Sequence, residues 1–422
     1  YTFEELLGTW IGNWDPDEIS HTKSYRPMAI LYYHITYWVF GENLFLFRTF
    51  VVLEILLLLV LTNQVFEMFN FSKNQIIIFT LLLIFSKIFI TLVSWFTISV
   101  LIMAYIFTLV SIKYYFLSIK KNNTFYFFTS LLFASFAILT REELYVLPAI
   151  ICLLYFYKFD INLKNIYICI KSTFLFFTLV FTHIFLRKIF VPGADHIQFI
   201  DNKIFYGENL IRFGGYIQAV KSSFLPMGYL SSSYSDDIQK FFSILWILLI
   251  FLALIFILRI YKLEMNKLKK ILIMFSLVII SALPHLTIAR SFGIFLPSIF
   301  ALMIVSILID KTFFRIDFLN DKLKYFGRVL SIVIIFTGVI GGIYRSFLHL
   351  ESVNKFSNSI IQYDARMLFH NDTRNATIPK KRYDENKKHL ENLNVFEYNW
   401  EKTYGEILSP KIIDNKYHPL RF

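Results

Sequence analysis

Long apolar segments separated by short polar stretches fill most of the chain between residues 44 and 346. Each segment approaches the roughly 20 residues that an α-helix needs to cross a bilayer. This pattern predicts an all-α, polytopic transmembrane bundle with about ten spans. They are expected near 44–65, 76–93, 96–117, 124–140, 144–160, 165–187, 241–259, 271–288, 292–309 and 328–346.

Three longer segments are too polar to cross a membrane. Residues 1–43 and 188–240 are expected to be outer loops of a membrane domain that covers 1–350, and 351–422 is expected to be a polar tail or small domain. Within the first loop, residues 24–48 combine apolar side chains at helical spacing with Tyr and Trp. That combination favours a helix at the membrane surface.

Composition agrees with a membrane protein, because 56% of the residues are hydrophobic and 19% are aromatic. The formal net charge of +12 comes from Lys and Arg residues that fall mainly in alternate loops. By the positive-inside rule these loops are cytoplasmic, namely 66–75, 118–123, 158–164, 259–270 and 310–328. Topology therefore explains the charge better than nucleic-acid binding does, and membrane lipids are the expected surroundings.

Little in the sequence indicates a metal or a disulfide. Cys152 and Cys169 both fall in apolar segments, and no His, Asp or Glu grouping has the spacing of metal ligands. We therefore expect no metal and no cofactor. The chain begins at Tyr1 on the side assigned as extracytoplasmic, so we also expect a further span before it.

Four motifs, in chain order, resemble those of the C-type glycosyltransferases, especially the branch of TMTC-like protein O-mannosyltransferases. They are Tyr25-Arg26-Pro27 with Phe40-Gly41-Glu42-Asn43, the segment LTREELYVLP that contains Arg141, the spacing of Tyr216, Pro226, Leu230 and Tyr234, and Pro284-His285 with Arg290 before Phe295-Leu296-Pro297-Ser298. In two places the chain departs from the family pattern. Val93-Ser94-Trp95 matches the start of the third outer element, but Ser86-Lys87 and Thr91 stand where relatives often have His-Pro and an upstream acid. Arg290 is two residues further from Pro297 than expected.

The resemblance implies an integral membrane hexosyl- or pentosyltransferase of the GT-C fold. Its donor would be a polyprenyl-phosphate sugar and its acceptor a protein or a lipid-linked glycan. The reaction would take place at the extracytoplasmic face of a bacterial inner membrane or of the endoplasmic reticulum.

Such a transfer needs a carboxylate base and cationic groups beside the departing phosphate. Asp15, Asp17 and Glu18 are candidate bases, unless a catalytic Asp precedes Tyr1 or the Asp-Pro-Asp sequence simply forms a turn. The candidate groups for the donor phosphate are Arg26, Lys87, Arg141, Glu142 and Arg290. For each of these the alternative is an interface anchor or a solvated loop charge. Tyr25, Pro27, Tyr234 and His285 are expected to shape the pocket.

Three other functions are compatible with the same pattern. An O-antigen polymerase or ligase also handles polyprenyl-linked glycans at the outer face. A transporter or flippase should show charged or Gly/Pro-broken sites at mid-membrane. A non-catalytic assembly protein, whose outer loops bind partners, would tolerate the loss of Arg26, Glu142 and Arg290 together.

Overall fold

The computed structural model is predominantly helical. It describes residues 25–41, 43–86, 88–89, 92, 99–191, 197–200, 203–206, 209–210, 213–225, 237–260, 265–286, 294–313 and 321–370. Contacts divide the chain into two units, Tyr1–Ser346 and Phe347–Phe422. Of the second unit, the structure describes only residues 347–370.

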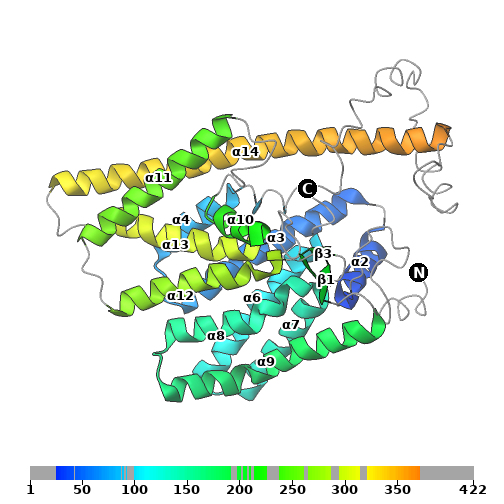
Figure 1. Cartoon of the computed structure of the whole chain (residues 1–422), viewed down its shortest axis with the longest axis horizontal. Coiled ribbons are helices and arrows are strands. Elements are labelled where there is room, and N and C mark those ends of the chain that lie inside the picture. The colour runs from blue at the N-terminus through cyan, green and yellow to red at the C-terminus, as the bar shows by residue number, and fades with distance from the viewer. Residues whose placement is uncertain are drawn as a thin grey trace. The chain divides into compact units, whose positions relative to one another are not determined.

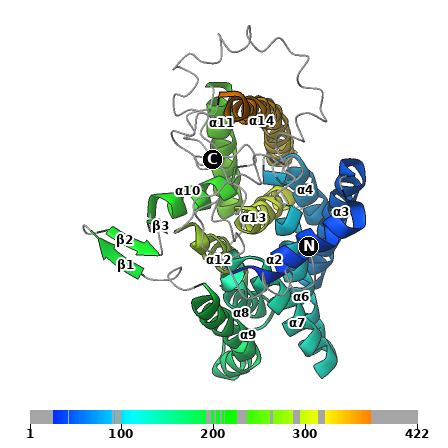
Figure 2. The same ribbon diagram turned by 90° about the vertical axis from the view of Figure 1, so that its right-hand side faces the viewer.

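The helices lie side by side, as Figures 1 and 2 show from two directions. They are α2 (Pro27–Phe40), α3 (Leu44–Met68), α4 (Lys73–Ile84), α6 (Ser99–Lys121), α7 (Thr124–Thr140), α8 (Leu147–Lys158), α9 (Leu163–Phe190), α10 (Phe213–Ser223), α11 (Asp237–Ile260), α12 (Met265–Ser281), α13 (Phe295–Phe313) and α14 (Asp321–His370). Two short 3₁₀ helices, η2 (Glu142–Val146) and η3 (Leu283–Leu286), precede α8 and α13. The predicted outer loop 188–240 contains an antiparallel sheet in the order β1 (Ile197–Ile200), β2 (Lys203–Tyr206), β3 (Asn209–Leu210).

Within the described residues, five helices are long and apolar enough to cross a membrane. They are Phe45–Met68, Ser99–Lys121, Leu163–Phe190, Phe295–Phe313 and Asp321–Leu348. Three shorter helices are also apolar, Lys73–Ile84, Thr124–Thr140 and Lys240–Phe256. The prediction of a helical membrane protein is confirmed at this level.

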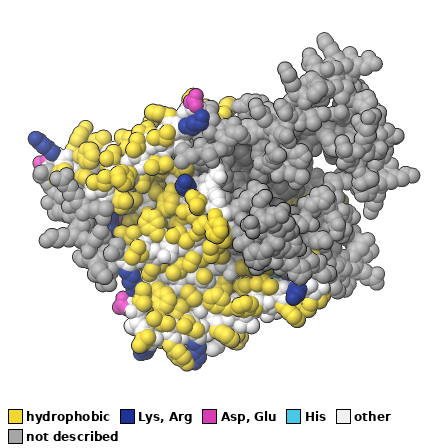
Figure 3. Space-filling model, in the orientation of Figure 1, with side chains coloured by type: hydrophobic (Ala, Val, Ile, Leu, Met, Phe, Trp, Pro, Cys, Tyr) yellow, Lys and Arg dark blue, Asp and Glu magenta, His cyan; other side chains and the backbone are white. Residues whose placement is uncertain are grey.

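Helix α13 forms the centre of the bundle. In its apolar window 89% of the residues are buried, and it packs against α4, α10, α11 and α12 (Figure 2). By contrast, only 28% of the apolar window of α9 is buried, and Phe181 and Phe185 point outward. Apolar side chains cover most of the described surface in Figure 3. A soluble monomer rarely exposes so large an apolar area, whereas lipid tails would cover it.

Two glycines let α14 approach its neighbours closely. A Cβ atom at Gly342 would overlap the backbone carbonyl of Phe85 at the end of α4. One at Gly338 would overlap the ring of Trp246 on α11. Small residues at such spacing on membrane helices allow direct contact between backbones.

Lysines gather at one end of the bundle. Lys158 donates to the Met68 carbonyl at 3.4 Å, and Lys269 donates to the Phe159 carbonyl at 2.9 Å. Lys270 lies over the Tyr157 ring, 5.3 Å from its centroid. These contacts bring together the ends of α3 and α8 and the start of α12.

Buried polar side chains connect the start of α4 to the end of α13. Gln75 and Ser72 form a capping box at the start of α4, in which the Gln75 side chain accepts from the Ser72 N–H at 2.9 Å. The Nε2 of Gln75 also donates to Asp310 Oδ2, in the last turn of α13, at 2.9 Å. The Gln75 amide therefore caps α4 through its oxygen and binds α13 through its nitrogen.

Candidate functional site

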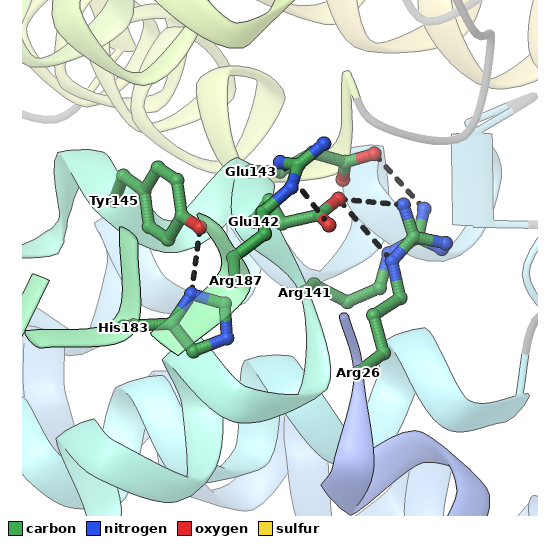
Figure 4. A network of polar contacts seen from close by, with 7 residues as sticks. All are labelled: Arg26, Arg141, Glu142, Glu143, Tyr145, His183 and Arg187. Atoms are coloured by element: carbon green, nitrogen blue, oxygen red, sulfur yellow. Dashed lines mark hydrogen bonds and ion pairs between the residues drawn. The ribbon is translucent and has the colours of Figure 1, made fainter. Parts of the chain in front are cut away.

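At the opposite end of the bundle, Arg26 contacts Glu142. Arg26 directly precedes α2, where Pro27 takes the first helical position and is buried. Its Nη2 donates to Glu142 Oε2 at 2.7 Å and its Nε donates to the same oxygen at 3.3 Å. Arg26 is buried, and the Glu142 side chain is 14% exposed. Two of the sequence motifs, 116 residues apart, thus meet in one ion pair (Figure 4).

A second guanidinium lies at the other oxygen of Glu142. Arg187 Nη1 is 3.3 Å from Glu142 Oε1, and Arg187 belongs to the last turn of α9. Burial alone would raise the pKa of Glu142, but the charges of Arg26, Arg187 and Arg141 outweigh it and lower this pKa to about 2. Glu142 is therefore ionised at neutral pH, between two arginines.

The second ion pair of the network joins Arg141 to Glu143. Helix α7 ends at Arg141, whose backbone is extended (φ −150°, ψ 125°), and η2 begins directly after it. Glu142 and Glu143 occupy the first turn of η2, where the helix dipole favours negative charge. Arg141 Nη2 donates to Glu143 Oε1 at 2.9 Å. The described network holds three arginines and two glutamates, which leaves one positive charge in excess.

A tyrosine–histidine pair adjoins the ion pairs. The Tyr145 hydroxyl and His183 Nδ1 are 2.6 Å apart, and His183 lies one turn before Arg187 on α9. The Tyr25 ring packs against His183 and against Phe190, each with 5.4 Å between ring centroids. Tyr25 therefore contacts the network through ring packing.

The structure brings together some of the residues that the sequence singles out. Arg26, Arg141 and Glu142 come together, with Tyr25 and Pro27 beside them. His285 is buried in η3, which contacts η2, but neither of its ring nitrogens has a hydrogen-bond partner among the described residues. The other predicted residues lie outside the described part of the chain: Asp15, Asp17, Glu18, Lys87, Tyr234 and Arg290.

Sequence reasoning missed Tyr145, His183 and Arg187. The signal for the last two was their i, i+4 spacing near the end of an apolar span, which places both on one helix face. Polar residues inside such a span are costly unless they have partners, so they call for a partner elsewhere in the bundle. For Tyr145 the sequence signal is weaker, because tyrosine is common near the ends of membrane spans.

No metal-ligand cluster accompanies the network among the residues that the structure describes. A cavity of about 20 Å³ lies at the lysine end and is lined by apolar residues such as Phe69 and Tyr157. No group of three or more His, Cys, Asp or Glu side chains could hold a metal ion in the described segments. The absence of a metal stays a prediction. No family model, curated protein or solved structure matches the chain.

Proposed function

We propose that this chain is an integral membrane glycosyltransferase that transfers a sugar from a polyprenyl-phosphate carrier to a protein or glycolipid acceptor. The observation that carries the proposal is the buried network in which Arg26, Arg141 and Arg187 pair with Glu142 and Glu143. When the sugar leaves its carrier, negative charge develops on the phosphate. Cations that are already fixed in place stabilise that charge without having to reorganise.

The proposed topology has about ten spans, formed by the apolar helices α3, α4, α6, α7, α8, α9, α11, α12, α13 and the first part of α14. The lysine end would face the cytoplasm by the positive-inside rule. The arginine network would then lie at the extracytoplasmic side, at the level where a lipid carrier presents its phosphate.

The carboxylates give the arginines a defined orientation. A guanidinium is a planar fork that suits two oxygens of a carboxylate or a phosphate. Glu142 holds Arg26 and Arg187 on its two oxygens, and Glu143 holds Arg141. In the proposed reaction the acceptor hydroxyl attacks the anomeric carbon while the bond from this carbon to the phosphate oxygen breaks. The electron pair stays on the phosphate, which the arginines face.

The test uses the full chain in nanodiscs with radiolabelled polyprenyl-phosphate mannose as donor. Donor binding and sugar transfer are measured separately. Arg26→Lys and Arg187→Lys keep the positive charge but lack the planar guanidinium group that binds two oxygens. Each is expected to lower the rate of sugar transfer by about 10²–10³-fold. Two exposed cations provide controls, Arg48→Gln and Lys188→Gln, and these variants should transfer at the wild-type rate.

Two results would contradict the proposal. Wild-type transfer by the Arg26→Lys, Arg187→Lys double variant would remove the phosphate role of the network. Transfer only from a polyprenyl-diphosphate oligosaccharide would move the chain to the polymerase or ligase class.

A further inference from the structure

A buried carboxylate on α3 faces α2, the helix that directly follows Arg26. Glu54 is 4% exposed, and Tyr32 of α2 donates to Glu54 Oε2 at 2.9 Å. Ser99, at the start of α6, lies beside the Tyr32 hydroxyl. The other carboxyl oxygen, Glu54 Oε1, is buried and has no hydrogen-bond partner in the described part of the chain.

An acidic side chain in this position needs an explanation. A carboxylate in an apolar layer is costly when no cation neutralises it, and such residues mark functional sites in membrane proteins. No cation of the described segments forms an ion pair with Glu54. Burial and the adjacent Glu54 raise the pKa of Tyr32 well above its ordinary value, so the phenol keeps its proton and remains a donor. Oε2 is thus occupied, and Oε1 is the atom that can take up a proton.

Helix α2 connects Glu54 to the arginine network. Arg26 precedes the first residue of α2, and Tyr32 follows six residues later, about 9 Å along the axis at 1.5 Å per residue. Tyr33 packs against Tyr32 with 5.6 Å between ring centroids. Burial raises the pKa of Tyr33 to about 12, and the charges of Arg141 and Arg26 act against this rise. Tyr33 therefore lies between the arginines and the pair that Tyr32 forms with Glu54.

The carboxylates of the arginine network are poorly suited to accept a proton. Glu142 lies between two guanidinium groups, which make it a very weak base. Glu143 is bound to Arg141. Among the described residues Glu54 has no such partner, so a proton on it forfeits no ion pair there.

We propose that Glu54 Oε1 accepts the proton of the acceptor hydroxyl group in the sugar transfer, an inference that rests on the proposed function. The acceptor oxygen forms a bond to the anomeric carbon, and the bond between that carbon and the phosphate oxygen breaks. The proton of the hydroxyl passes to Oε1, which becomes a neutral carboxyl group. The electron pair of the broken bond stays on the polyprenyl phosphate at Arg26, Arg141 and Arg187. Nothing is oxidised or reduced.

The first experiment compares Glu54→Gln with Glu67→Gln in the nanodisc assay with polyprenyl-phosphate mannose. Gln at position 54 keeps the size of the side chain and an acceptor for Tyr32, but it cannot take a proton. The control, Glu67, belongs to the same helix and is exposed at the lysine end. Glu54→Gln should bind the donor as wild type does and transfer about 10²–10⁴-fold more slowly. Glu54→Asp should recover part of the rate.

A second experiment does not depend on a substitution. A hydrophobic carbodiimide reacts with protonated carboxyl groups in apolar surroundings, and the modified residue is identified by mass spectrometry. Glu54 carries a proton after each transfer, so in the wild-type chain supplied with donor and acceptor the reagent should modify Glu54 and stop transfer while donor binding persists. This result would support the proposal even where Glu54→Gln does not fold.

The outcomes separate the two proposals. If Glu54→Gln binds and transfers like wild type, or if the chain modified at Glu54 still transfers, Glu54 is not the proton acceptor. The transferase would stand in that case, and Asp15→Asn, Asp17→Asn and Glu18→Gln would be tested next. If the wild-type chain neither binds nor uses any polyprenyl-phosphate donor, the proposed function and the role of Glu54 fail together.

Discussion

Arg26 Nη2 and Glu142 Oε2 are 2.7 Å apart, although the two residues are separated by 116 positions. The contact fixes the start of α2 against the junction of α7 and η2. Because Arg187 approaches the same carboxylate from α9, Glu142 holds two arginines and three segments of the chain together. Its removal should therefore affect stability as well as activity.

Glu142→Gln should destabilise the protein by about 3–5 kcal/mol, because it leaves the buried Arg26 and Arg187 without their common countercharge. Unfolding of the purified chain in detergent, followed by denaturant titration, measures this change. Glu67→Gln, at an exposed position, is the control and should change stability very little. A loss below about 1 kcal/mol would mean that the network contributes no more than surface ion pairs do.

The stability of the wild-type chain should depend on acidity through the same residue. The pKa of Glu142 is lowered to about 2 in the folded protein, against 4.5 as its ordinary value. The unfolded chain therefore takes up this proton first, and the stabilisation is fully present above pH 4.5 and is lost as the pH falls towards 2. The melting temperature of wild type should fall in this window more steeply than that of Glu142→Gln. Parallel curves would assign the acid sensitivity to other groups.

Gly342→Ala should destabilise the bundle by about 1–3 kcal/mol, because the added methyl group overlaps the Phe85 carbonyl. The matched control is Gly214→Ala on α10, where a Cβ has nothing within 4 Å and the gain in helix propensity is about 1 kcal/mol. Thermal unfolding of both variants gives the comparison. Equal stability of the two variants would show that α14 is free to move away from α4.

The hydrogen bond between Tyr145 and His183 should appear in a double-mutant cycle. Tyr145→Phe leaves the buried imidazole without this partner, at a cost of about 1–3 kcal/mol. Combined with His183→Phe, the second substitution should add less than it does alone, with a coupling energy of 0.5 kcal/mol or more, a typical order for residues in contact. Additive losses would indicate that the 2.6 Å contact contributes nothing specific.

Topology is tested by cysteine labelling in intact cells. Cys152 and Cys169 are first replaced by Ala, and single cysteines are placed at Lys121, Lys269 and Gln198. A membrane-impermeant maleimide should label position 198 from outside, and positions 121 and 269 only after permeabilisation. External labelling of position 269 would place the arginine network on the cytoplasmic side and so exclude an extracytoplasmic donor.

Local sequence patterns predict where the helices begin and end better than they predict which helices contact one another. The apolar pattern predicts a span at 124–140, and α7 has these bounds because Asn123 caps its start and Arg141 ends it. Helix α9 extends beyond the predicted 165–187 because Asn162 caps it earlier and it continues to Phe190.

For the site, the sequence indicates Arg26, Arg141 and Glu142 one motif at a time. It does not indicate that Arg26 pairs with Glu142 while Arg141 pairs with Glu143. The role of Arg187 is harder still to predict, because Arg187 is the last residue of a predicted span. Its countercharge, Glu142, follows a different helix, α7. Such pairings depend on how the helices rotate and pack, which no local spacing encodes.

The side-chain amide of Gln75 joins the cap of its own helix to a contact with a second helix. Its oxygen completes the cap of α4 and its nitrogen reaches Asp310 at the end of α13. If α4 slid along α13, the side chain would have to give up either the cap or the neighbouring helix. The contacts of Gln75 therefore oppose small displacements of α4 along α13 at the point where α4 begins. A change of register between the two helices would also open the first turn of α4.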